Sequence, residues 1–259
     1  MNYYHIDSFT KELFKGNPAG VCILEKEWPT DQTMMDMAAE NRHSETAFVL
    51  YKEEKYHIRW FAPLSEIYLC GHATLAAAYA LFEGEKVDQE KIEFHSNRGI
   101  LTVAQSNLGL TMDFPLCTLG ALEYQPIFDE CFKNPPKEVY QANADILFVY
   151  DKVEDITDCG FDLAKIAQVP GEGIIITAKG EDCDFVSRCF CPQVGIDEDP
   201  VTGSAHTALV SYWKPILGKE TFFAKQLSPR GGEMTCEIQG DRVLLSGSAV
   251  LYMKGEITL

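Results

Sequence analysis

The stretch Glu66-Ile67-Tyr68-Leu69-Cys70-Gly71 recurs in outline 132 residues later as Glu198-Asp199-Pro200-Val201-Thr202-Gly203. Each copy ends on a glycine and is followed by a run of small residues with helical character. A second pair of segments, Ser96-Asn97-Arg98-Gly99 and Ser228-Pro229-Arg230-Gly231, repeats with the same offset. Two repeats at one offset predict two matched halves, each built around a helix that begins at a glycine.

The first of these helices, predicted at 71–83, is expected to be buried. Its residues 73–81 are apolar on nearly every face, and a helix that is hydrophobic all round normally lies in a core. We therefore predict an α+β fold in which each half is a set of strands around one buried helix. The proline-containing segment 115–141 is the predicted crossover between the halves, which are expected to be 1–115 and 116–259.

Hydrophobic alternation and turn residues predict the remaining elements. In the first half we expect a helix at 31–41 and strands at 2–8, 20–24, 45–52, 56–61, 91–95, 99–105 and 109–114. In the second half we expect a helix at 203–214, short helical pieces within 152–168, and strands at 145–150, 173–178, 184–191, 221–227, 232–238, 241–246 and 249–253.

Composition excludes several classes of partner. The 259-residue chain carries a net charge of −17, and binding to nucleic acid needs clustered Lys and Arg to neutralise phosphates. No apolar run approaches the roughly 20 residues that cross a bilayer, and residues 1–14 show no continuous apolar leader. Nine cysteines without a framework spacing predict free thiols in a reducing cytoplasm, and no metal-ligand spacing is present.

The two helix starts are candidate anion sites. A helix N-terminus presents unpaired N–H groups and a partial positive charge, and glycine lets a ligand approach the backbone. The segments Gly71-His72-Ala73 and Gly203-Ser204-Ala205 are therefore expected to hold a small carboxylate despite the acidic composition. The alternative is that both glycines only permit close packing where a strand turns into a helix.

Three side chains near these segments suit acid/base chemistry. Glu45 precedes a hydrophobic run, so its carboxyl is either desolvated, with a raised pKa, or simply solvated at a strand end. Asp199 precedes the second helix, where a carboxylate also serves in an Asx turn or stabilises the helix dipole. A lone histidine such as His72 is more often a structural hydrogen-bonding group.

Six segments together resemble the PhzF family of phenazine-biosynthesis-like isomerases, whose fold is similar to that of diaminopimelate epimerase. They are Asp7-Ser8-Phe9-Thr10, Gly16-Asn17-Pro18-Ala19-Gly20, Ser44-Glu45-Thr46-Ala47-Phe48, Cys70-Gly71-His72-Ala73-Thr74, the segment from Glu198 to His206, and Arg230-Gly231-Gly232. The resemblance implies two pseudo-symmetric epimerase-like domains, each a strand-rich half-barrel around a central helix, with the active-site cleft between them. It also implies a homodimer and no cofactor.

The resemblance further implies the roles of single residues. Glu45 matches the catalytic carboxylate that moves a proton within a small anionic cyclic substrate. In the member that gives the family its name, this substrate is trans-2,3-dihydro-3-hydroxyanthranilate. Asp199 and His72 match positions that assist proton transfer. The expected substrate-binding residues are Gly71, Ala73, Thr202, Gly203 and Ser204.

Two alternatives to this isomerase stay open. One is an epimerase or racemase of an amino or hydroxy acid that uses Glu45 with Cys70 or Asp199 as opposed bases. The other is a catalytically silent protein that binds a small carboxylate. The sequence argues against a two-thiol racemase, because the counterpart of Cys70 in the repeat is Thr202 and the opposite face would lack its acid. This leaves Cys70 without an assigned role in the isomerase, and packing is the default expectation.

Overall fold

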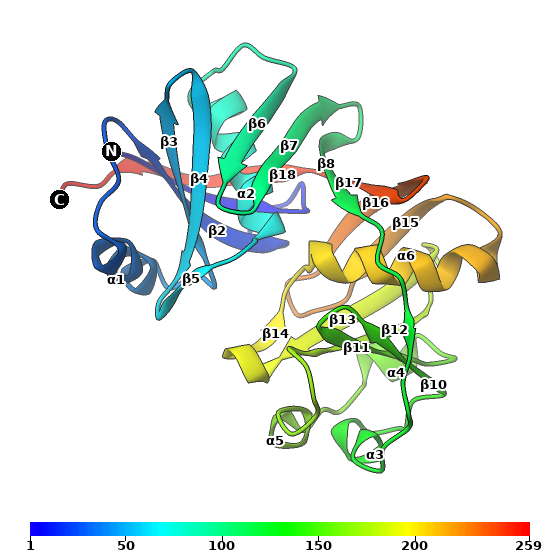
Figure 1. Ribbon diagram of the computed structural model, residues 1–259. Helices are drawn as coiled ribbons and strands as arrows, with labels where there is room; N and C mark the ends of the chain where they lie inside the picture. Colours follow the sequence, from blue (N-terminus) through cyan, green and yellow to red (C-terminus); the bar gives the residue numbers. More distant parts are fainter. The chain divides into compact units, whose positions relative to one another are not determined.

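A computed structural model describes residues 1–259 and confirms a strand-rich α+β fold (Figure 1). Contacts divide the chain into two units. Unit 1 comprises Met1–Asp113 together with Ser246–Leu259, and unit 2 comprises Phe114–Leu245. The predicted halves were 1–115 and 116–259, whereas these contacts group residues 246–259 with unit 1.

Unit 1 contains most of the elements expected for the first half. They are β1 (Asn2–Ser8), β2 (Asn17–Leu24), α1 (Asp31–Asn41), β3 (Thr46–Lys52), β4 (Lys55–Ala62), β5 (Ser65–Ile67), α2 (Gly71–Tyr79), β6 (Lys91–Ser96), β7 (Gly99–Ser106), β8 (Gly109–Pro115) and β18 (Ala249–Glu256). The side-chain oxygen of Thr30 accepts a hydrogen bond from the backbone N–H of Thr33 and so caps α1. The short β5 was not predicted.

Unit 2 repeats this arrangement with shorter additional pieces. Its elements are β9 (Gly120–Ala121), α3 (Phe128–Cys131), β10 (Glu138–Ala142), β11 (Asp145–Val149), α4 (Glu154–Thr157), α5 (Leu163–Ile166), β12 (Ile174–Lys179), β13 (Phe185–Cys191), β14 (Ile196–Asp199), α6 (Gly203–Leu217), β15 (Thr221–Gln226), β16 (Gly232–Gln239) and β17 (Arg242–Gly247). The predicted crossover thus contains β9, α3 and part of β10. Its prolines suggested a linker, yet Phe128 and Cys131 are buried against Phe148.

Strand pairing confirms the internal repeat that the sequence predicts. In unit 1 the order β1-β2-β3-β4-β6-β7 alternates antiparallel and parallel pairs, with β5 paired antiparallel to β4. In unit 2 the order β10-β11-β12-β13-β15-β16 follows the same alternation, with β14 paired antiparallel to β13. Helix α2 follows β5, and α6 follows β14, so the two helices occupy equivalent places.

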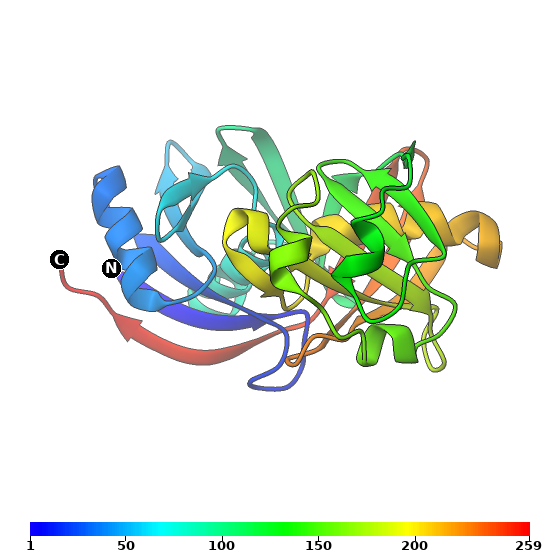
Figure 2. The ribbon, with the colours of Figure 1, turned by 90° about the horizontal axis from the view of Figure 1, so that it is seen from below.

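The C-terminal strand completes the sheet of unit 1. β18 pairs antiparallel with β1 from Ala249 opposite Ser8 to Glu256 opposite Asn2. Figures 1 and 2 both show β18, in red, running beside the blue β1. The first and last strands of the chain are therefore neighbours within one unit.

Each unit holds its helix against its own strands. Every residue of α2 from His72 to Ala78 is buried, and α2 contacts β1, β2 and β3. In unit 2, Trp213 of α6 donates from its indole Nε1 to Thr177 Oγ1 at 3.1 Å and stacks on Phe185. The predicted helix at 71–83 ends as α2 at Tyr79 and continues as a π-helical turn to Gly84. None of the helices is long and apolar enough to cross a membrane.

Candidate active site

Glu45 lies in unit 1 at the point where the chain enters β3. The next five residues, 46–50, are all buried, and β3 runs between β2 and β4. Only 8% of Glu45 is exposed, so the solvated strand end is not what the structure shows. Burial raises the pKa of the Glu45 carboxyl, and a hydrogen bond from the Ser44 side chain opposes this shift. A carboxyl with a raised pKa is suited to both accept and donate a proton.

The start of α2 positions two more functional side chains beside Glu45. Cys70 is the N-cap residue in an extended conformation, and its carbonyl accepts from Thr74 Oγ1 at 2.6 Å. The carbonyl of His72 accepts from Ser8 Oγ of β1 at 2.8 Å. These bonds tie the first turn of α2 to its surroundings and hold the Cys70 and His72 side chains, both buried, at the helix start.

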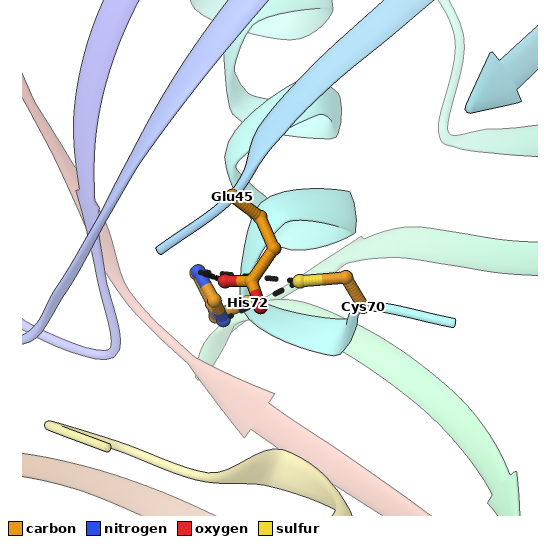
Figure 3. Close-up of side chains that lie close together, drawn as sticks. All are labelled: Glu45, Cys70 and His72. Carbon is orange, nitrogen blue, oxygen red and sulfur yellow. Dashed lines mark hydrogen bonds and ion pairs between the residues drawn. The ribbon is translucent and has the colours of Figure 1, made fainter. Parts of the chain in front are cut away.

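The three side chains converge, as Figure 3 shows. Glu45 Oε2 lies 3.4 Å from His72 Nε2, and Cys70 Sγ lies 3.5 Å from His72 Nδ1. One donor atom from each of the three residues lies within 4.8 Å of the others. Glu45 Oε2 is buried and makes no hydrogen bond, and its contact with His72 is an ion pair when the imidazole is protonated. The cluster places a carboxyl, an imidazole and a thiol together at the start of α2.

The distance between Glu45 and Cys70 tests whether these two residues could act as the opposed bases of an epimerase or racemase. Two bases that act on opposite faces of one carbon each lie about 3–3.5 Å from it, and therefore about 6–7 Å from each other. The donor atoms of Glu45 and Cys70 lie within 4.8 Å of one another. They are too close to flank a stereocentre, which disfavours a racemase that uses this pair.

The second group of predicted residues lies in unit 2, at the turn from β14 into α6. Thr202, the N-cap residue of α6, donates from Oγ1 to Asp199 Oδ2 at 2.5 Å. Gln226 of β15 donates from Nε2 to the Asp199 carbonyl at 2.7 Å, and its Oε1 accepts from the Thr202 N–H at 2.8 Å. The Asp199 carboxylate is therefore held by a side-chain bond to the turn.

The remaining predicted binding residues differ in what they can offer a ligand. Ser204 is exposed and Gly203 is buried at the start of α6, and the Ser204 carbonyl accepts from Thr207 Oγ1 at 2.7 Å. Gly71 is partly exposed, whereas the Ala73 side chain is fully buried. Any contact of Ala73 with a substrate would therefore have to come from its backbone.

Two functional candidates were missed. Cys70 had no assigned role in the predicted isomerase, although it stands two residues before His72 at a helix start, a spacing that places both side chains at one end of a helix. Asp145, like Glu45, stands directly before a run of buried strand residues. Burial, with repulsion from Glu172 and Asp199, raises the pKa of Asp145 to about 6.

Comparison with known proteins agrees with the resemblance. A profile of the family described as phenazine biosynthesis-like protein matches residues 6–255. An uncharacterized isomerase of Pseudomonas aeruginosa is 41% identical, over 100% of this chain and 99% of its own. The crystal structure of a PhzF-family phenazine biosynthesis protein from Enterococcus faecalis has a TM-score of 0.96 at 41% identity, covering 100% of this chain and 99% of that chain.

The fold extends to a more distant group of enzymes. A hydroxyproline epimerase from Agrobacterium vitis, crystallised with trans-4-hydroxy-L-proline, has a TM-score of 0.64 at 10% identity. The likeness covers 98% of this chain and 91% of the epimerase. At this identity the similarity shows a common fold and nothing about the reaction.

Proposed function

Because this chain belongs to the PhzF family of phenazine biosynthesis-like isomerases, we propose that it moves a proton within a small cyclic amino or carboxylic acid without a cofactor. The observation that supports the proposal most directly is the buried carboxyl of Glu45 in contact with His72 at the start of α2. A pure binding protein has no need of a desolvated carboxyl with a raised pKa, because burying that group is unfavourable.

The proposed reaction is a proton transfer in which substrate and product are isomers. The Glu45 carboxylate removes a proton from one ring carbon, the double bonds shift, and the resulting carboxylic acid returns the proton to another ring carbon. One C–H bond breaks and one forms, so no other reactant is consumed. His72, 3.4 Å from Glu45, orients the carboxyl and balances its charge.

The unit 2 residues have supporting roles in the proposal. Asp199, held by Thr202, assists the proton transfer. The helix starts supply N–H groups for the substrate carboxylate, since a helix N-terminus favours an anion. The proposed substrate-binding residues are Gly71, Ala73, Thr202, Gly203 and Ser204.

The test is proton NMR of the protein with trans-2,3-dihydro-3-hydroxyanthranilate in deuterated water, with Glu45→Gln measured in parallel. We expect isomerisation with deuterium incorporation for the wild type. The variant should lose at least about 100-fold in kcat, because general acid–base catalysis contributes about 10²–10⁴. Circular dichroism and ligand titration should show that the variant still folds and binds.

Three results would argue against parts of this proposal. A Glu45→Gln variant that keeps most of its rate would remove Glu45 from the chemistry. Deuterium at a stereocentre with loss of optical activity, and no double-bond shift, would identify an epimerase instead. No exchange with this compound or with other cyclic amino acids would favour a binding protein.

A further inference from the structure

The cluster in unit 1 combines three kinds of donor that a transition metal accepts. Glu45 offers a carboxylate oxygen, His72 an imidazole nitrogen and Cys70 a sulfur, and one such atom from each lies within 4.8 Å of the others. The sequence spacing predicted no metal site, because Glu45 is 25 positions before Cys70. The fold brings them together by placing the entry of β3 beside the start of α2 (Figure 3).

One of the distances matches a tetrahedral zinc site. Zinc bonds of about 2.0–2.2 Å to nitrogen and oxygen and about 2.3 Å to sulfur place neighbouring donors about 3.4–3.6 Å apart. Glu45 Oε2 lies 3.4 Å from His72 Nε2, and Cys70 Sγ lies 4.0 Å from the same nitrogen. The sulfur lies nearer to His72 Nδ1, at 3.5 Å, so a zinc ion bound at Nε2 requires the Cys70 and His72 side chains to rotate.

A second observation points to a cation at this place. Glu45 is more than nine-tenths buried, and its Oε2 atom makes no hydrogen bond. The contact with His72 Nε2 at 3.4 Å does not provide this oxygen with a hydrogen bond, and a bound cation would satisfy it. The oxygen faces His72 and the Cys70 sulfur, as Figure 3 shows.

The geometry points to a zinc(II) site formed by Glu45, Cys70 and His72, and we propose that its occupation inhibits the enzyme. Zn²⁺ replaces the thiol proton of Cys70, so binding forms a Zn–S bond and releases one proton. The bound metal would occupy the carboxylate that the reaction uses, and only this inhibitory effect rests on the function proposed above. Mixed nitrogen, oxygen and sulfur donors suit zinc, whereas Mg²⁺ and Ca²⁺ require oxygen ligands.

Metal binding is measured on the full chain, reduced and freed of metal with a chelator. Zn²⁺ affinity comes from competition with a chromogenic chelator, and Co²⁺ serves as a spectroscopic probe through its thiolate charge-transfer absorption. We expect one site per chain with this absorption. Cys70→Ser should abolish the absorption and weaken Zn²⁺ binding at least 10–100-fold, since losing even an outer-sphere partner costs that much.

A matched control separates this cluster from other thiols. Cys189 and Cys191 lie with their sulfurs 3.5 Å apart in unit 2, and Cys191→Ser should leave the Co²⁺ spectrum and Zn²⁺ affinity unchanged. In the NMR assay, Zn²⁺ should inhibit the wild type and the Cys191→Ser variant, and a chelator should restore both. Cys70→Ser, compared with its own rate before Zn²⁺ is added, should resist Zn²⁺ at the same concentration.

The outcomes distinguish the two proposals. A Co²⁺–thiolate spectrum that survives Cys70→Ser, or disappears in Cys191→Ser, would overturn the zinc site and leave the isomerase proposal intact. Binding that depends on Cys70 in a protein without isomerase activity would support the site and remove its inhibitory role. An active enzyme that Zn²⁺ does not inhibit, although it binds Zn²⁺ through Cys70, would also overturn the inhibitory role.

Discussion

His206 is a single residue whose protonation is linked to folding. Its imidazole is fully buried in α6, with Nδ1 2.8 Å from the Thr202 carbonyl, and burial lowers its pKa to about 4. An unfolded histidine has a pKa of about 6.5, so below that pH the unfolded chain binds a proton that the folded chain does not. Stability is therefore lost as the pH falls from 6.5 through 4, by about 2 kcal/mol at pH 5 from this group.

This loss is measured by urea unfolding at pH 7.5 and pH 5.0 for the wild type and His206→Gln. The difference in free energy of unfolding between the two pH values should be about 2 kcal/mol smaller in the variant. Comparing two proteins at each pH is necessary, because Asp145 has a raised pKa and acts in the opposite direction. An identical pH dependence in both proteins would contradict the buried, neutral imidazole.

For single residues, the sequence identified candidate side chains but did not determine whether they are buried or what they contact. Glu45 and His72 were both predicted as catalytic candidates, and the structure places Glu45 Oε2 3.4 Å from His72 Nε2. The burial of Glu45 stayed undecided, because a strand end can face either water or a helix. Cys70 had no assigned role, since only the fold shows that β3 enters beside the start of α2.

At the scale of elements, one glutamine ties β15 to the turn between β14 and α6. Gln226 is buried and bonds to the Thr202 N–H, the Thr202 hydroxyl and the Asp199 carbonyl. Gln226→Ala would leave a backbone N–H and a carbonyl without these partners. We expect a loss of about 2–4 kcal/mol in the free energy of unfolding, measured with urea, because each unsatisfied group costs about 1–3 kcal/mol.

Gln239→Ala is the control for that prediction. Gln239 is exposed at the end of β16 and bonds only to the partly exposed Glu237 side chain, so its loss should change stability by less than about 0.5 kcal/mol. Equal effects of the two substitutions would show that the Gln226 bonds do not stabilise the turn.

The sequence predicted β15 and α6 but missed β14, because its residues Ile-Asp-Glu-Asp lack the alternation that marks a strand.

At the scale of the whole molecule, sequence repeats revealed the doubled architecture but not the path of the last strand. The common offset predicted two halves, and the matching pairing orders of the two units confirm that repeat. Because the chain was divided at a single point, residues 249–253 were nevertheless predicted in the second half. Local hydrophobic patterns identify strands, but they carry no information about which sheet a strand joins about 250 positions away.

The C-terminal strand is therefore predicted to stabilise unit 1 specifically. Deleting residues 249–259 removes one of the two strands that pair with β1 along its whole length. At about 0.5 kcal/mol per net hydrogen bond, the lost ladder costs about 3 kcal/mol or more. Amide hydrogen exchange should show faster exchange in β1 and β2, while β12 and β13 of unit 2 keep their protection, because local opening follows the contacts of each region.

Deleting only residues 258–259, which lie beyond β18, should leave both units protected. If β12 and β13 lost protection as much as β1, the last strand would be stabilising unit 2, and the division of the chain described by its contacts would be wrong.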